Sequence, residues 1–205
     1  MKVRVIKGTN QIGGCITEVK SDNAKIVIDF GEDLPDDDNK VKSENPNIVG
    51  LTCGKSIYDA VFITHSHYDH FDLSSINKII KEDTVLVVPF CMKEEMLKNG
   101  FQEENIVTVL PQENYTICSI PVEVIASYNI DKVFHEKEKA WVGYIITLQD
   151  ERIYVAGDTD ITKENQEVFC DIALVPIGGT YTMDYKEASI LVNKIKPKVV
   201  IPTHY

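Results

Sequence analysis

Residues 60–70 read Ala-Val-Phe-Ile-Thr-His-Ser-His-Tyr-Asp-His, a short apolar run followed by three histidines and an aspartate. The whole chain has five histidines, and a solvated or merely packed loop gives no reason to gather three of them here. Side chains alternate along an extended segment, so His65 and His67 point to one side and can hold one ion together. A turn into a helix would then aim Asp69 and His70 at a second ion. Imidazole and carboxylate suit Zn²⁺, and also iron or manganese, so the segment predicts a metal centre at a strand end.

Short runs rich in valine and isoleucine recur along the chain and are typical of strands. Several are apolar throughout, which indicates strands buried on both faces and covered by helices. Helical spacing appears at 73–81, 92–97 and 184–196, where Asp184 and Glu187 can form a capping box. We therefore expect two sheets flanked by helices. The expected strands are 3–6, 16–19, 26–30, 60–63, 85–88, 106–109, 122–126, 142–148, 153–156, 172–175 and 199–201.

Composition narrows the class of protein. The chain has 205 residues, a formal charge of -11 and 43% hydrophobic residues, which fits one globular domain over residues 1–205. The acidic balance disfavours nucleic acid as a partner. The five cysteines are scattered and form no CxxC pair, and no secretory signal or apolar membrane span is seen. These features predict a cytoplasmic protein without membrane contact. They are also compatible with a homo-oligomer.

The pattern His65-x-His67-x-Asp69-His70 after an apolar strand resembles the signature of the metallo-β-lactamase superfamily. Other segments resemble that superfamily in the same order: Asp29-Phe30-Gly31, Gly157-Asp158-Thr159 and Pro202-Thr203-His204. Residues 173–183 and 196–205 are similar to its ascorbate-6-phosphate lactonase-like branch. Residues 8–14 resemble instead the opening of ribonuclease J-type nucleases, whose inserted domain a chain of this length cannot hold.

The resemblance implies a four-layer αβ/βα sandwich of the α/β class with two divalent ions at one edge. Zn²⁺ is the first choice, with Mn²⁺ or Fe²⁺ as alternatives. The sequence leaves open whether position 135 supplies the third histidine of the first metal. The commoner pattern has this ligand directly after the 122–126 strand, where this chain has Ser127-Tyr128-Asn129. Either His135 reaches in from its loop, or the first metal lacks its third histidine. The implied ligands are His65, His67 and His135 for the first metal, Asp69, His70 and His204 for the second, and Asp158 between them.

The resemblance also implies an enzyme, a metal-dependent hydrolase in which a metal-bridged hydroxide attacks a carbonyl or phosphoryl centre. Asp69 is the expected catalytic residue, and Asp29 is expected to orient a ligating histidine. The expected substrate is an ester, lactone or phosphoester of a small anionic molecule. The alternatives are a nucleic-acid phosphodiesterase and a non-catalytic metal-binding protein that retains the fold.

Three other segments allow two interpretations each. Residues 31–56 are either a solvated acidic loop or a lid over the site. Backbone N–H groups of Gly178-Gly179-Thr180 could bind an anionic group, or the segment is a plain strand-to-helix loop. Lys132, Lys137 and Lys139 could form a basic rim near His135, although Glu136 and Glu138 lie among them.

Overall fold

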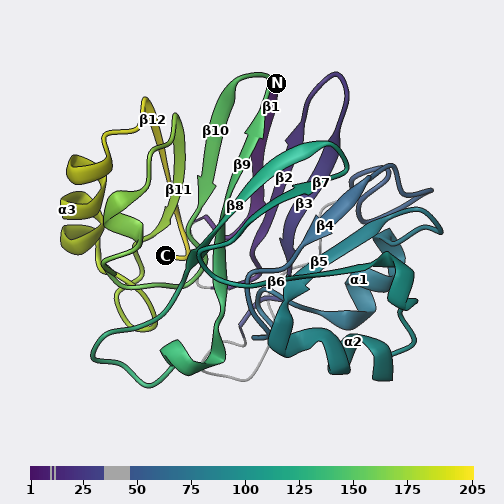
Figure 1. Cartoon of the computed structure of the whole chain (residues 1–205), viewed down its shortest axis with the longest axis horizontal. Helices are drawn as coiled ribbons and strands as arrows, with labels where there is room; N and C mark the ends of the chain where they lie inside the picture. The colour runs from purple at the N-terminus through teal and green to yellow at the C-terminus, as the bar shows by residue number, and fades with distance from the viewer. Residues whose placement is uncertain (10, 12, 35–46) are drawn as a thin grey trace.

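The computed structural model describes residues 1–9, 11, 13–34 and 47–205. Residues 35–46 of the 31–56 segment that was considered as a lid lie outside this described part. Two six-stranded sheets run through the described residues and face each other, with helices on both outer sides (Figure 1). This confirms the predicted α/β sandwich.

The strands of the first sheet lie side by side in the order in which they follow one another along the chain. The first three are antiparallel, and β3 to β6 are parallel. These strands are β1 (Lys2–Lys7), β2 (Ile16–Lys20), β3 (Lys25–Phe30), β4 (Ala60–Phe62), β5 (Val85–Pro89) and β6 (Ile106–Val109).

The second sheet is also built in chain order, with β7 to β10 antiparallel and β10 to β12 parallel. Its strands are β7 (Asn114–Ile117), β8 (Ile120–Ala126), β9 (Val142–Leu148), β10 (Glu151–Val155), β11 (Ile172–Pro176) and β12 (Val199–Thr203). Because β8, β10 and β12 run in the same direction, their carboxyl ends meet at one edge. The carboxyl ends of β3 and β4 in the first sheet share an edge as well, so functional side chains at these ends can converge.

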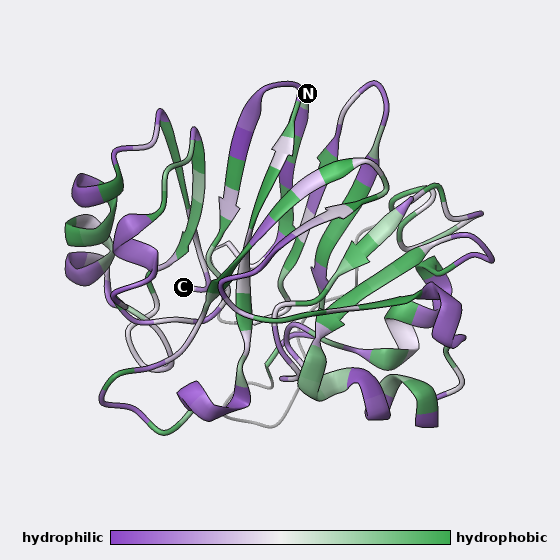
Figure 2. Cartoon of the chain, viewed as in Figure 1, coloured by the Kyte–Doolittle hydropathy of each residue, from purple (hydrophilic) through white to green (hydrophobic). Residues whose placement is uncertain are grey.

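Three apolar clusters hold the layers together. Alternate residues of β3 belong to two of these clusters. Ile26 and Ile28 pack between the sheets, whereas Val27 packs against the outer helices. Facing them across the sandwich are residues of the second sheet such as Val124 and Tyr144. The strands are therefore buried on both faces, as their continuous apolar sequences predict, and Figure 2 shows green stretches along these strands and both green and purple on the helices outside them.

The helices cover the outer faces of the sheets. Helices α1 (Leu73–Ile79) and α2 (Lys93–Lys98) cover the first sheet, and α3 (Tyr185–Ile195) covers the second (Figure 1). Asp184 caps α3 in the predicted capping box, and Asp72 caps α1 by accepting a hydrogen bond from the Ser75 N–H. Short 3₁₀ turns occur at Phe90–Met92, Glu103–Asn105, Lys137–Lys139 and Asn165–Glu167.

One strand was not predicted from the sequence. Strand β7 pairs with β8 at the edge of the second sheet, and its residues alternate between exposed and partly buried positions. Asn-Tyr-Thr-Ile has too few apolar residues to form a run, so its pairing depends on the neighbouring hairpin strand. None of the described helices is long and apolar enough to cross a membrane.

Candidate metal centre

The loop that follows β4 carries the first four predicted ligands, and its backbone is held against the first sheet. The Phe30 N–H donates to the His70 carbonyl at 2.8 Å, and the Cys15 N–H donates to the Asp69 carbonyl at 2.8 Å. Gly31 is required beneath this loop, because a Cβ there would lie 1.9 Å from the carbonyl carbon of Asp69. The Asp-x-Gly segment thus lets the ligand loop sit directly on the end of β3.

The structure brings all seven predicted ligands together at the edge where the strand ends meet. They form two groups, and within each group the ligating atoms lie within 4.8 Å of one another. The first group is His65, His67 and His135, and the second is Asp69, His70, Asp158 and His204.

Asp158 lies between the two groups. Its Oδ2 is 3.1 Å from the Nε2 of His204 in one group and 3.5 Å from the Nε2 of His135 in the other. The residue follows β10 after Gly157, which adopts a left-handed φ of 65°. This is the geometry that a bridging carboxylate requires.

His135 reaches the centre from the loop between β8 and β9 and is only 1% exposed. Its Nε2 lies 3.4 Å from the Nε2 of His65. Asn129 fixes the loop: its side-chain oxygen lies 3.1 Å from the His135 backbone nitrogen, which donates to it, and 3.3 Å from the ring Nδ1. Of the two alternatives at this position, the structure shows a histidine that reaches in.

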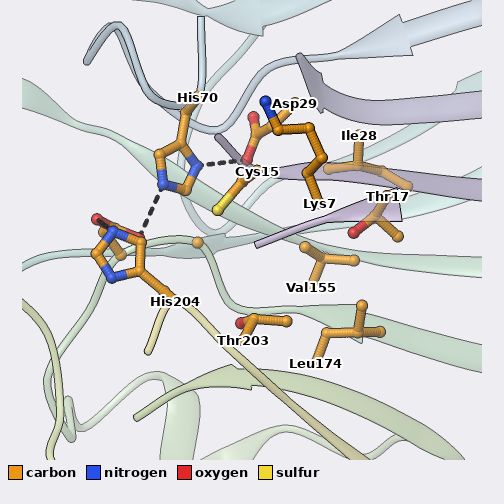
Figure 3. Close-up of a pocket in the computed structure, with 12 residues that line it drawn as sticks. Lys7, Cys15, Thr17, Ile28, Asp29, His70, Val155, Leu174, Thr203 and His204 are labelled. Carbon is orange, nitrogen blue, oxygen red and sulfur yellow. Dashed lines mark hydrogen bonds and ion pairs between the residues drawn. The ribbon is translucent and has the colours of Figure 1, made fainter. Parts of the chain in front are cut away.

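Asp29 orients His70, as the sequence predicts. Its Oδ2 lies 2.8 Å from the Nδ1 of His70, which leaves the Nε2 of that ring to face the centre. The Thr64 N–H and hydroxyl both donate to the same carboxylate at 2.8 Å. Figure 3 shows the His70 ring between Asp29 on one side and His204 on the other. Asp29 has a left-handed φ of 57°, a conformation that is uncommon for residues other than glycine and that clusters at functional sites.

His204 is held from two sides although it lies at the end of β12. Its backbone N–H donates to the Gly8 carbonyl at 2.6 Å, and the next N–H, that of Tyr205, donates to the Gln11 carbonyl at 3.1 Å. On the other side Gly178 packs so closely that a Cβ would lie 2.4 Å from the His204 carbonyl oxygen. These contacts fix the position of His204.

Trp141 forms an apolar support beneath the first group. Its ring centroid lies 5.2 Å from that of His65, 4.8 Å from that of His67 and 5.4 Å from that of His135. Since this indole is 6% exposed, it shields one side of the three imidazoles from water. The sequence analysis missed Trp141, and the isolated indole before β9 carries no motif that could have identified it.

The electrostatics of the centre suit a cation. Burial lowers the pKa of His135 to about 4 and holds the pKa of His65 well below its usual value, so both rings are neutral and able to bind metal. Burial alone would raise the pKa of Asp158, but His70 and His204 hold that pKa well below its usual range. Against the opposing effect of burial, Asp158 and Asp69 raise the pKa of His204 to about 10.

The donor set fits divalent ions. Asp158 and Asp69 are buried carboxylates, and no lysine or arginine among the described residues pairs with either. Buried charges are costly unless they are paired or coordinate a metal. Nε2 of His70 and Oδ1 of Asp158 face each other at 3.1 Å, and neither forms a hydrogen bond of regular geometry in the described part of the chain. Imidazole and carboxylate in these numbers are the ligands of zinc, iron and manganese sites.

Comparison with known proteins agrees with the fold and shows the family. A family model described as a beta-lactamase superfamily domain matches residues 15–204. A UPF0173 metal-dependent hydrolase of Saccharolobus solfataricus is 31% identical over 199 residues, covering 89% of this chain and 81% of that protein. One of Pyrococcus horikoshii is 31% identical over 166 residues, covering 72% of this chain and 66% of the relative. The match thus spans about two thirds of the length of the Pyrococcus protein.

Solved structures share the architecture. A metallo hydrolase of Ignicoccus hospitalis superposes with a TM-score of 0.69 at 22% identity, covering 95% of this chain and 81% of the other. An isothiocyanate hydrolase from Delia radicum gut bacteria gives a TM-score of 0.72 at 19% identity, with 100% and 85% coverage. At these identities the likeness shows the fold alone. The family match and the curated relatives go further, and they show that this chain belongs to the metallo-β-lactamase superfamily and, within it, to the UPF0173 metal-dependent hydrolase family.

Proposed function

We propose that this chain is a metal-dependent hydrolase that cleaves an ester, lactone or phosphoester of a small molecule. The observation that carries the proposal is the convergence of seven buried or half-buried ligands in two groups, with Asp158 within reach of both. A non-catalytic protein would have no need for two adjacent groups with open space beside them. The names of the curated relatives support the same reaction class.

The residues divide into two ion sites. His65, His67 and His135 would hold one ion, Asp69, His70 and His204 the other, and Asp158 would contact both. When bound, divalent ions of this kind lower the pKa of water toward neutrality and polarise the oxygen under attack. Zn²⁺ is the first choice for such ligands, with Mn²⁺ or Fe²⁺ as alternatives.

The chain's own residues supply orientation and proton transfer. We assign Asp69 as the residue that accepts the proton of the attacking water on its Oδ2, which lies 3.4 Å from the Nε2 of His204. Asp29 keeps His70 in one ring orientation, and Asn129 does the same for His135. Such partners of ligating histidines commonly change metal affinity or activity by about 10–100-fold when they are lost.

The resemblance of residues 173–183 and 196–205 to the ascorbate-6-phosphate lactonase-like branch supports lactones as one substrate class. The acidic balance of the chain, with a formal charge of -11, argues for a small molecule rather than nucleic acid. A cytoplasmic location, a single domain and a homo-oligomeric state remain proposals from the sequence.

The test is hydrolysis by the metal-loaded protein and by Asp69→Ala. Elemental analysis should find up to two transition ions per chain. The wild type should hydrolyse a 4-nitrophenyl ester, an aryl lactone or bis(4-nitrophenyl) phosphate, and Asp69→Ala should lose about 100-fold or more of kcat/KM. Asp83→Ala, which removes an exposed carboxylate, is the matched control.

Metal content and circular dichroism of both variants separate a lost chemical role from a lost ion or a lost fold. If Asp69→Ala retains most of the activity, the assigned role is wrong. A metal-loaded wild type that hydrolyses none of the three substrate classes would contradict the proposed function itself.

A further inference from the structure

A cavity of about 190 Å³ opens directly onto the metal centre, and its far wall is apolar. One side consists of the ligands themselves, including His67, Asp69 and His204. The other side consists of Leu34, Tyr68, Phe134 and Tyr181, which we call the apolar wall. A substrate whose scissile bond lies at the ligands would place its remaining atoms against this wall.

Four separate segments of the chain build the apolar wall, and three of them are tied to the metal centre. Tyr68 belongs to the ligand loop itself, and Phe134 precedes His135. The backbone carbonyl of Tyr181 accepts a hydrogen bond from the Asn129 side chain at 3.0 Å, the same side chain that fixes His135. Phe134 and Tyr181 pack edge to face, with their ring centroids 4.7 Å apart. The position of the apolar wall relative to the ligands is therefore fixed by contacts within the chain.

The rings of this wall remain partly open to solvent. Phe134 is 40% exposed and Tyr68 is 46% exposed, and both line the cavity beside the predicted metal ligands. Exposed apolar side chains gathered around a cleft are typical of ligand-binding sites. The wall thus has apolar surface that a bound substrate would cover.

No cationic partner for an anionic substrate lines this cavity in the described part of the chain. The nearby lysines have other partners: Lys132 contacts Asp160 and donates to the Thr182 carbonyl, and Lys137 contacts Glu164. The Gly179 N–H, considered from the sequence as part of an anion site, donates instead to the Met183 carbonyl at 3.0 Å. Two of the three lysines and one of the three N–H groups considered for an anionic substrate are thus paired within the fold.

We infer that the cavity selects an uncharged substrate, an ester or lactone whose acyl or leaving group is an aryl ring or a short alkyl chain. The inference rests on the proposed hydrolase function and names its substrate class. A cavity of about 150 Å³ accepts benzene in a well-studied engineered protein. The cavity of about 190 Å³ includes space at the ligands that bound ions would fill, so the remainder has room for one ring or a short alkyl chain. An anionic group placed against this wall would lose its hydration without gaining a partner.

The test compares two esters of nearly equal shape, 4-nitrophenyl butyrate and 4-nitrophenyl hemisuccinate, which differ by one negative charge. The metal-loaded wild type should prefer the butyrate by about 10-fold or more in kcat/KM, the scale on which apolar pockets discriminate. Phe134→Ala and Tyr181→Ala should each reduce this preference, whereas Tyr181→Phe should keep it because the ring remains. Val133→Ala is the matched control, since Val133 is 81% exposed in the same loop and does not line the cavity.

Binding gives a readout that does not depend on catalysis. Butyranilide and its anionic counterpart succinanilate are slowly hydrolysed amides, and calorimetric titration should show tighter binding of butyranilide that weakens in Phe134→Ala. Equal or faster turnover of the hemisuccinate would overturn the inference while leaving the hydrolase intact. If none of the ester, lactone and phosphodiester substrates is hydrolysed, the proposed function fails. Tighter or equal binding of succinanilate would overturn the inference independently of catalysis.

Discussion

The position of His135 decides between a first metal site with three histidines and one that lacks the third. Its sequence neighbours give no strand, no tight turn and no spacing that would place it, and yet its ring is buried against His65. Asn129 explains the placement, because it binds both the backbone and the ring of His135. The polar segment Ser127-Tyr128-Asn129 occupies the position at which the commoner pattern has the ligand. In this chain Asn129 of that segment holds His135 in place.

His135→Ala is expected to weaken metal binding at the first group by at least about 10-fold, the lower end even for residues that only orient ligands. Competition with a chromophoric chelator measures this affinity, and metal content gives the number of ions retained. Glu136→Ala, an exposed neighbour in the same loop, should bind metal as the wild type does. Unchanged affinity in His135→Ala would show that the ring is only packed in place.

At the scale of single residues, the sequence predicts the ligand residues better than it predicts the residues that hold them in place. The motif of residues 65–70 identifies four candidates because histidines rarely cluster without a metal. The orienting role of Asp29 also follows from its place at a strand end. Trp141 could not be found in this way, because one apolar ring in a chain rich in apolar residues carries no pattern. Its contact with three imidazoles depends on how two sheets meet.

Among the elements, β2 shows how an edge of the first sheet is held by charge as well as by packing. Glu18 on β2 is 2% exposed and contacts Arg4 at 2.9 Å and Lys20 at 2.7 Å. The Tyr58 hydroxyl donates to the same carboxylate. Burial alone would raise the pKa of Glu18, but the hydrogen bonds from Lys20 and Tyr58 and the charge of Arg4 lower it below 4.5.

A lowered pKa in the folded state gives stability that is present above the unfolded value of 4.5 and is lost as the pH falls through the folded value. Glu18→Gln should therefore reduce the free energy of unfolding at pH 7 by about 1–3 kcal/mol. The difference between variant and wild type should shrink below pH 4.5. Urea denaturation between pH 3 and 7 measures both effects, with the exposed Glu104→Gln as control. A constant difference across this range would contradict the assignment.

Elements with continuous apolar sequences or clear caps are predicted well, and α3 with its capping box is the best example. Strand β7 shows where this fails. Its Asn114 and Thr116 face solvent, so the local sequence has no apolar face of its own, and the strand forms because Tyr115 and Ile117 pair with Val122 and Ile120 of β8. Edge strands of this kind depend on a neighbour rather than on their own composition.

For the whole molecule, the ligands come from both halves of the sandwich. Residues 65–70 follow a strand of the first sheet. In the second sheet, Asp158 and His204 follow strands, and His135 lies in the loop between β8 and β9. The sheets also meet directly at the site, where the Val142 N–H donates to the Thr64 carbonyl at 3.1 Å and the Tyr144 hydroxyl to the Ile63 carbonyl at 2.6 Å. An ion in either group would therefore connect the two sheets.

Removal of metal should lower the melting temperature. An ion present at 100 times its dissociation constant stabilises the folded state by about 2.7 kcal/mol. For a chain of this size, each kcal/mol corresponds to about 2–4 °C. Calorimetry before and after treatment with a chelator measures the shift, which re-addition of Zn²⁺ should reverse. A double variant His67→Ala with His204→Ala should show little response, and equal melting of the loaded and stripped wild type would contradict a structural role for the ions.

The strand order of the two sheets has a consequence for how the molecule assembles. Every strand neighbours the strand that precedes or follows it in the chain, so each sheet can form from pairings within its own half. Local pairings of this kind are quick to form compared with contacts between distant segments. The ligand groups, in contrast, need residues as far apart as His65 and His204. The metal centre is therefore expected to be completed last in folding, after the sheets have docked, and a chain with only one half folded would offer an ion an incomplete set of ligands.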